Sequence, residues 1–138
     1  MNVRHKSETP LAWLTLGLTS LHFVLETWFH FLWGQPLQAL IVDYISNILM
    51  VFAGITSLRI GQRSAAGLIA AAWTFNLGFG WRSVFGRIEI VQAGEAMPNG
   101  EASFVLPLLI GSLVLVGCMM VWALWLAYWQ AVYSGEYK

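Results

Sequence analysis

Residues 104–131 read FVLPLLIGSLVLVGCMMVWALWLAYWQA and contain no charged side chain. The hydrocarbon core of a bilayer is about 30 Å thick, and roughly 20 helical residues are enough to cross it. The stretch exceeds that length without interruption. It therefore predicts a membrane-spanning helix, and the remaining apolar stretches are candidates for the helices that surround it.

Three further stretches have the length and apolar character of membrane spans, at about 10–33, 37–58 and 65–85. Thr9-Pro10 supplies an N-cap followed by proline at the first helical position. The turns that separate the first three spans are Gly34-Gln35-Pro36 and Gly61-Gln62-Arg63-Ser64. Because short connections make consecutive helices antiparallel neighbours, the chain is predicted to be all-α. We expect a single domain over 1–138, an integral membrane antiparallel four-helix bundle with four transmembrane helices.

The composition excludes several classes of protein. Of the 138 residues, 58% are hydrophobic and 10% are charged, whereas about a quarter of the residues of a soluble domain are charged. The formal net charge of zero gives no basic footprint for nucleic acid, so we expect no nucleic-acid partner. The single cysteine, Cys118, allows no intramolecular disulfide and no cysteine-based metal cluster. The expected partner is the lipid bilayer, with a larger membrane complex or a homo-oligomer as open alternatives.

The distribution of charge predicts the orientation in the cell membrane. Arg4 and Lys6 precede the first span, and Arg59 and Arg63 flank the connection between the second and third spans. The long connection, roughly 87–103, is acidic after its first residue, with three glutamates that need water: Glu89, Glu95 and Glu101. Since cytoplasmic loops carry the excess of Lys and Arg, both termini of this multi-pass chain are predicted to be cytoplasmic.

The polar residues inside the spans are the candidates for a functional site, because an ionisable group in hydrocarbon is costly and is retained for a reason. Counted from the span ends, one group falls near the midplane: His22, Asn47 and Asn76. A second group falls in the outer half: Glu26, His30, Asp43, Arg82 and Arg87. His22, Glu26 and His30 recur every four residues and form one stripe on the first span.

The helical phase predicts how the other spans face the bundle. On the second span a seam of polar and small residues recurs every three to four residues and should face inward: Asp43, Asn47, Met50, Gly54, Ser57 and Gly61. On the third span, Arg87 is phased better than Arg82 to approach Glu26 and Asp43. The fourth span carries an apolar and aromatic side, from Pro107 through Cys118 to Trp129, for which packing or lipid contact is favoured over a stacked hydrophobic ligand.

Metal and haem sites are not expected. His22 and His30 are about 12 Å apart along a helix axis, so they cannot share an ion with Glu26 when zinc–nitrogen bonds are near 2 Å. A site of Glu26, His30 and Asp43 is geometrically open, but a carboxylate-bridged di-iron centre needs more acids than these spans contain. Two axial histidines for haem would have to face each other from opposing helices, and both belong to the first span. We therefore expect no metal and no cofactor.

The charged residues in the outer half of the spans have two interpretations. In the first, arginine neutralises Glu26 and Asp43 in a network that fixes the order of the helices. In the second, this group of residues opens to the external side and binds a polar group or relays protons, with a histidine whose charge changes near neutral pH. The first function that follows is a non-enzymatic one, an accessory subunit or a small binding or transport component with this polar cluster as its core.

A short motif suggests the alternative function. His22-Phe-Val-Leu-Glu26-Thr-Trp-Phe29 resembles the His-x-x-x-Glu followed by an aromatic residue of the sterol-isomerase-like family of four- and five-helix membrane proteins. The resemblance covers about eight residues, and the longer acidic loop of that family is replaced here by Gly34-Gln35-Pro36. It implies an intramembrane enzyme on a lipid-like substrate, with Glu26 as acid/base and His22 or His30 as its proton partner. Asn47 and Asn76 would orient the substrate.

Overall fold

The structure, a computed structural model, describes residues 4–61, 63–97 and 100–133. In these ranges the chain forms four α-helices and no strand, so the predicted all-α fold is confirmed. The helices are α1 (Glu8–Trp33), α2 (Leu37–Arg59), α3 (Ala66–Gln92) and α4 (Val105–Tyr133). The shortest, α2, has 23 residues. At about 1.5 Å per residue, even this helix is long enough for a hydrocarbon core of about 30 Å.

Two helix ends differ from the predicted ones. α1 begins at Glu8 with Ser7 as its N-cap, and the amide of Leu11 donates to the carbonyl of Ser7 at 3.2 Å. The prediction of a Thr9 cap was wrong, because Pro10 is also tolerated as the third helical residue, where the missing amide would have had no intrahelical partner. α3 continues to Gln92 instead of ending near 85. Arg87 therefore belongs to a helix and not to the connection.

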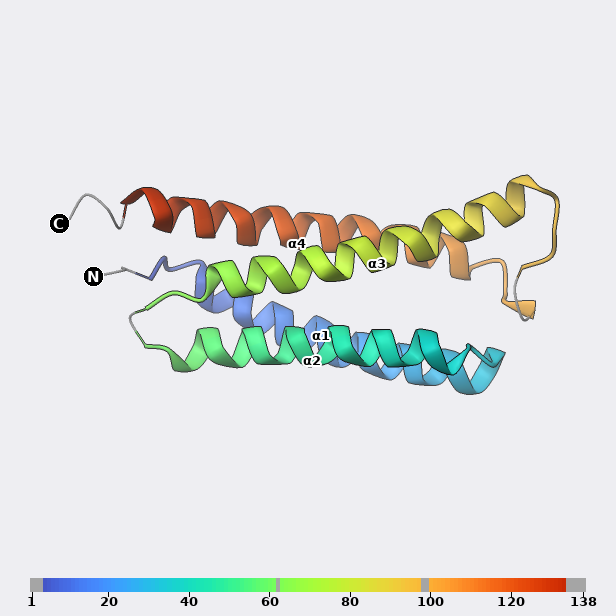
Figure 1. The fold of residues 1–138 in the computed structure, drawn as a ribbon, viewed down its shortest axis with the longest axis horizontal. Helices are drawn as coiled ribbons and strands as arrows, with labels where there is room; N and C mark the ends of the chain where they lie inside the picture. Colours follow the sequence, from blue (N-terminus) through green and yellow to red (C-terminus); the bar gives the residue numbers. More distant parts are fainter. Residues whose placement is uncertain (1–3, 62, 98–99, 134–138) are drawn as a thin grey trace.

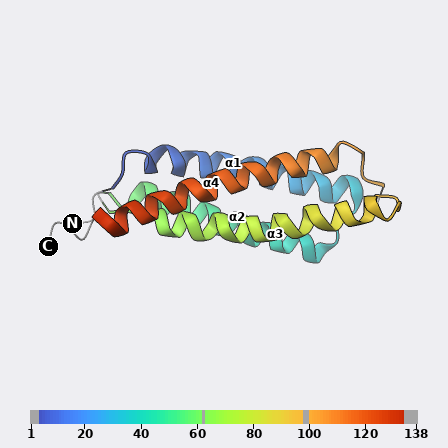
Figure 2. The same ribbon diagram turned by 90° about the horizontal axis from the view of Figure 1, so that it is seen from above.

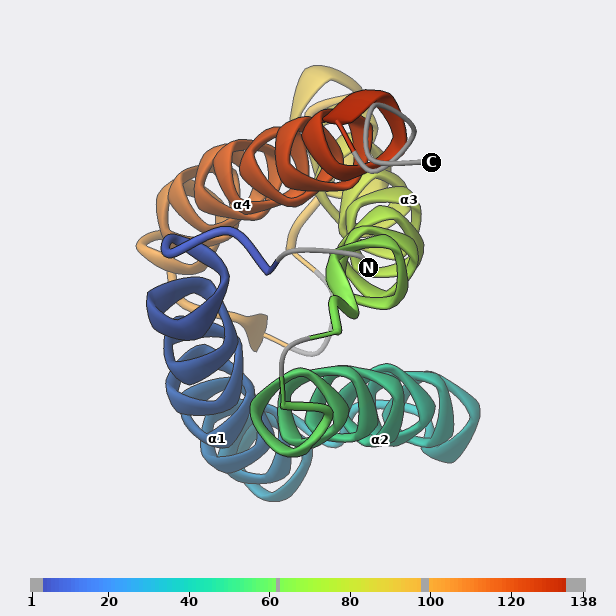
Figure 3. The ribbon, with the colours of Figure 1, turned by 90° about the vertical axis from the view of Figure 1, so that its left-hand side faces the viewer.

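The helices alternate in direction, so the start of α1 and the end of α4 lie at the same end of the bundle (Figure 1). α1 packs along α2 and α3 packs along α4 (Figure 1), and α2 lies beside α3 (Figure 2), as predicted for antiparallel neighbours. α1 approaches α3 and α4 at only a few positions. Viewed from the end where α1 begins, the four helices surround a common interior (Figure 3).

The apolar core fills the half of the bundle that contains the start of α1 and the end of α4. Its members are buried side chains from all four helices: Leu11, Ala12, Met50, Ala53, Ala66, Ile69, Ala70, Ala72, Trp73, Met119, Ala123 and Leu126. The indole Nε1 of Trp73 donates to Thr15 Oγ1 at 3.0 Å, which joins α3 to α1 and satisfies the buried N–H of the ring. This half of the bundle is closely packed, which leaves the interior of the other half for polar side chains.

The predicted seam on α2 faces inward. Asp43, Asn47, Met50, Gly54 and Ser57 are all buried, while Gly61 lies beyond the helix in a turn with a φ of 68°. A Cβ added at Gly54 would lie 2.8 Å from Leu16 Cγ. The lack of a side chain at Gly54 therefore lets α1 and α2 approach each other closely.

The outer surface is apolar on every helix. Large exposed side chains include Trp13 on α1, Ile48 on α2, Trp81 on α3 and Val114 on α4. The apolar side of α4 also points outward at Cys118 and Trp125, which agrees with packing or lipid contact as its role. In the part of the chain that the structure describes, two helices, α2 and α4, are long and apolar enough to cross a membrane. This finding gives weak support to the predicted membrane association. It does not extend to the predicted four spans.

Candidate functional site

A cavity of about 670 Å³ lies between the helices next to the apolar core, with Met50 and Trp73 of the core in its wall. All four helices and the connection before α4 contribute to its lining. Most of the wall is apolar, with Phe29, Trp33 and Leu113 among its larger members. Polar side chains reach it from three directions: Glu26 on α1, Asp43 on α2 and Arg87 on α3. The cavity therefore combines an apolar enclosure with a few localised polar groups.

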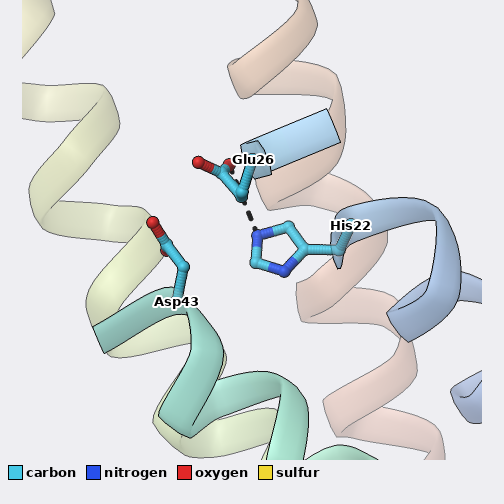
Figure 4. Close-up of side chains that lie close together, drawn as sticks. All are labelled: His22, Glu26 and Asp43. Carbon is cyan, nitrogen blue, oxygen red and sulfur yellow. Dashed lines mark ion pairs between the residues drawn. The ribbon is translucent and has the colours of Figure 1, made fainter. Parts of the chain in front are cut away.

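Three side chains converge on one wall of this cavity, and we call them the His22–Glu26–Asp43 cluster. His22 and Glu26 lie one turn apart on α1, and Asp43 faces them from α2, with all three side chains directed toward one another (Figure 4). His22 Nε2 is 3.5 Å from Glu26 Oε1. One nitrogen or oxygen atom from each residue lies within 4.8 Å of the others. The wall can thus present an imidazole and two carboxylates to a single small ligand.

Two amide side chains hold the cluster in place. His22 Nδ1 is 2.8 Å from Asn47 Oδ1. Because the amide oxygen can only accept, Nδ1 carries the proton and Nε2 is directed at Glu26. Gln35 Nε2 donates to Asp43 Oδ2 at 3.0 Å. Hydrogen bonds with Asn47 and Gln35 therefore hold the orientations of the imidazole and of one carboxylate.

Arginine does not neutralise the cluster. Across residues 4–61, 63–97 and 100–133, no Lys or Arg nitrogen lies within 4.0 Å of the carboxylate of Glu26 or Asp43. Arg87, which was expected there, instead donates to both carboxylate oxygens of Glu101, at 2.8 and 2.6 Å. Arg82 is exposed and lines the cavity. The cluster therefore keeps two acidic groups opposite one histidine.

The pairing of Arg87 also corrects the prediction for Glu101. We expected Glu101 to need water, but its side chain is only 6% exposed. The bidentate contact with the guanidinium provides the hydrogen bonds that water would otherwise supply. Arg87 Nη1 also donates to Ser83 Oγ at 2.7 Å. Arg87 thus connects the segment before α4 to α3, and both Arg87 and Glu101 line the cavity.

The remaining predicted residues divide between the cavity and its surroundings. Asn76 lines the cavity from α3, whereas Asn47 lies behind His22. His30 is not brought to the carboxylates. Its Nδ1 lies 2.8 Å from the carbonyl oxygen of Gln35, in the turn that follows the left-handed Gly34. His30 lies on α1 one turn beyond Glu26, but its ring is held by the turn that follows the helix and does not join the carboxylates.

The sequence analysis missed one buried carboxylate at the opposite end of the bundle. Glu8 is fully buried. Its Oε1 accepts hydrogen bonds from Ser57 Oγ and from the amide of Ala65, each at 2.8 Å. Its Oε2 accepts from Ser64 Oγ at 2.6 Å and from Gln130 Nε2 at 3.1 Å. These donors come from α2, the α2–α3 connection and α4, so Glu8 joins the packed ends of the helices.

The two sites with buried carboxylates differ in chemical capacity. The donors around Glu8 saturate its oxygens and leave no place for a ligand. The His22–Glu26–Asp43 cluster lines a cavity and presents lone pairs that its own partners do not use up, so it can accept a cation or the polar end of a small molecule. No family model, no curated protein and no solved structure matches this chain.

Proposed function

We propose that the chain is a four-span protein of the cell membrane, with both termini in the cytoplasm, that acts as a small binding or transport component. Its ligand is a small lipid-like molecule held in the cavity between the helices. In the cell it acts alone, as a homo-oligomer or as an accessory subunit of a larger membrane complex. The observation that carries the proposal is the cavity of about 670 Å³, which is apolar over most of its wall and polar at the His22–Glu26–Asp43 cluster.

The contrast between surface and interior supports a membrane environment. Phe31, Ile48 and Val114 are 81%, 67% and 63% exposed, whereas Asp43 and Asn47 are 2% and 5% exposed. Soluble monomers rarely expose large contiguous apolar patches. A chain that turns apolar side chains outward and polar ones inward on the same helices matches the requirements of a bilayer, where polar groups must find partners inside the protein.

The dimensions of the cavity support a small-molecule ligand. Binding pockets for small molecules typically have volumes of about 300–1,000 Å³, apolar walls and a few placed polar groups. In this cavity the ligand's apolar part would lie along Phe29, Trp33 and Leu113, and its polar end would face the cluster. Entry from the lipid phase suits such a molecule because it is already concentrated there.

Obstruction of the cavity tests this function. Ala39 lines the cavity from α2, so Ala39→Phe would fill part of it. Ala71 is exposed on α3 and does not line the cavity, so Ala71→Phe is the matched control. Native mass spectrometry of the protein purified in mild detergent should show a bound lipid-like molecule in the parent and in Ala71→Phe, and loss of it in Ala39→Phe. An equal occupancy in all three would exclude the cavity as the binding place.

A second candidate function is favoured by the His22–Glu26 pair on the cavity wall. With Nε2 and Oε1 3.5 Å apart, the two groups are close enough to exchange a proton after a small movement. In an intramembrane enzyme, Glu26 would be the acid/base, His22 its proton partner, and Asn76 would orient a lipid-like substrate. Under this hypothesis Glu26→Gln leaves the folding and the assembly of the protein intact and abolishes conversion of the bound molecule.

A further inference from the structure

We propose that the His22–Glu26–Asp43 cluster binds one divalent transition-metal ion of the zinc type. The ligands would be His22 Nε2, one carboxylate oxygen of Glu26 and one of Asp43. This inference goes beyond the proposed binding of a lipid-like molecule and does not depend on it. It also departs from the expectation of no metal, which considered Glu26 and His30 with either His22 or Asp43 as the third ligand.

The distances between the donor atoms suit one ion. Ligand atoms at about 2.0–2.2 Å from a tetrahedral zinc ion lie roughly 3.3–3.6 Å from one another. His22 Nε2 and Glu26 Oε1 are already 3.5 Å apart. All three donor atoms lie within 4.8 Å of one another. A movement of the carboxylate oxygens by about 1 Å brings the three atoms to the spacing of a tetrahedral zinc site. The i,i+4 spacing of His22 and Glu26 on α1 makes the first two ligands a rigid pair.

The hydrogen bonds behind the donor atoms are those of a metal site. A histidine that ligates a metal usually donates its other ring N–H to an oxygen, and ligating carboxylates are hydrogen-bonded in turn. His22 Nδ1 has such an oxygen in Asn47 Oδ1 at 2.8 Å, and Asp43 Oδ2 accepts from Gln35 Nε2 at 3.0 Å. The hydrogen bonds of Asn47 and Gln35 are independent of the distances between the donor atoms. The two residues are positioning residues for this site.

The charge of the cluster also calls for a cation. Asp43 is 2% exposed, and the Glu26 side chain is 16% exposed. Two buried carboxylates this close can both be ionised only when a cation compensates them; without one, a proton is retained between them. Among the described residues, the Lys and Arg nitrogens all lie more than 4.0 Å from both carboxylates. A divalent ion would bring the formal charge of the site to zero.

The donor set favours zinc over magnesium or calcium. Magnesium and calcium prefer six or more oxygen ligands, whereas an imidazole nitrogen suits zinc and its neighbours in the first transition row. Three protein ligands leave a fourth position for water or for a ligand oxygen. Because the cluster lines the cavity, that position would face the molecule held there. The ion would supply Lewis-acid binding of an oxygen at the polar end of the cavity.

Metal titration of the full chain tests the proposal. The tag-free protein in detergent micelles is stripped with a chelator and titrated with Zn²⁺ against a chromophoric competitor, and with Co²⁺ to follow its ligand-field absorption. We expect one Zn²⁺ per chain, a Co²⁺ spectrum of low-coordinate type, and no competition from millimolar Mg²⁺. Absence of stoichiometric Zn²⁺ binding, or a Co²⁺ spectrum identical to that of the hexa-aqua ion, would overturn the proposal.

Variants distinguish the residues that would ligate the metal from the residues that position them. Glu26→Gln, Asp43→Asn and His22→Gln should each abolish stoichiometric binding, and Asn47→Ala should weaken it by about 10-fold to 100-fold. The matched controls are Glu89→Gln, an exposed acid on α3, and His5→Gln, at the opposite end of the bundle. Both should bind as the parent does. Circular dichroism checks that each variant is helical, and retention of parental affinity in the helical His22→Gln/Asp43→Asn double variant would contradict the site.

The outcomes for the ion and for the lipid-like molecule are independent. Zn²⁺ binding that depends on the cluster, together with no bound lipid in native mass spectra, would support the ion site and contradict the proposed function. A lipid whose binding is blocked by Ala39→Phe, in a chain that binds no Zn²⁺, would contradict the ion site alone.

Discussion

Two of the buried carboxylates, those of Glu8 and Asp43, are stabilised in different ways. Glu8 accepts four hydrogen bonds from neutral donors on three other segments. Asp43 accepts one from Gln35 and lies beside Glu26 and His22. A carboxylate with saturated oxygens holds helices together, whereas a carboxylate with unused lone pairs on a cavity wall is available to a ligand. Glu8 therefore joins the helix ends, whereas Asp43 keeps the free lone pairs on which the proposed binding depends.

Replacement of Glu8 tests the structural assignment. Glu8→Ala should lower the free energy of unfolding by roughly 3 kcal/mol, because a buried donor left without an acceptor costs about 1–3 kcal/mol. Glu8→Gln keeps one accepting oxygen and should cost less. The measurement is chemical unfolding in detergent, followed by circular dichroism. Glu89→Ala, which removes an exposed glutamate from α3, is the control and should be neutral; an equal loss of stability in both variants would contradict the assignment.

At the scale of single residues, the sequence predicted which polar side chains are neighbours along a helix better than it predicted their tertiary partners. The four-residue spacing correctly placed His22 and Glu26 on one face of α1. It could not show that the chain turns back at Gly34 and draws His30 to the carbonyl of Gln35. Nor could it show that Arg87 pairs with Glu101, because that contact depends on how the connection folds back onto α3. The spacing of residues determines which side chains are neighbours along one helix. Contacts between helices and connections determine the other partners of these side chains.

At the scale of helices, the close approach of α1 and α2 depends on a single glycine. Gly54→Ala would place a Cβ 2.8 Å from Leu16 Cγ and 3.4 Å from the carbonyl oxygen of Ala12. Since overpacking typically costs about 1–3 kcal/mol, we expect a loss of that size in the free energy of unfolding. In the Leu16→Ala background the same substitution should cost nothing, because the side chain that it meets is gone.

A glycine of another helix provides the control for this prediction. A Cβ at Gly117 on α4 would meet nothing within 4 Å. Gly117→Ala should therefore be neutral or stabilise the helix by up to about 1 kcal/mol. The same unfolding measurement serves for all of these variants. A Gly54→Ala protein as stable as its parent would show that α1 can move away from α2 at no cost.

The helices themselves were largely predictable from the sequence, and the exceptions have physical causes. Long apolar stretches between glycine and proline turns fixed the number and order of the helices. The end of α3 was misplaced because Arg87 looked like a residue of the connection, whereas its pair with Glu101 allows the charge to remain on a helix. The start of α1 was misplaced because Pro10 is compatible with more than one position in the first turn.

At the scale of the whole molecule, the two halves of the bundle are built differently. One half contains the apolar core around Trp73 and is fastened by Glu8. The other half contains the cavity, which Arg87 and Glu101 both line. This asymmetry along the bundle axis was not visible in the sequence, because core and cavity draw on the same four helices. It places the packed half at the end with the basic connection and the half with the cavity at the end with the acidic connection.

The orientation of these two halves in the membrane is the last testable consequence. Arg63 and Glu95 are both exposed and lie in connections at opposite ends of the bundle. In a Cys118→Ser background, which itself should not react, Glu95→Cys should be labelled in intact cells by a membrane-impermeant maleimide. Arg63→Cys should be labelled only after permeabilisation, because the excess of Lys and Arg holds its connection in the cytoplasm. The reverse pattern would invert the orientation, and labelling of both in intact cells would contradict four spans. The expected pattern would place the half of the bundle that contains the cavity toward the exterior.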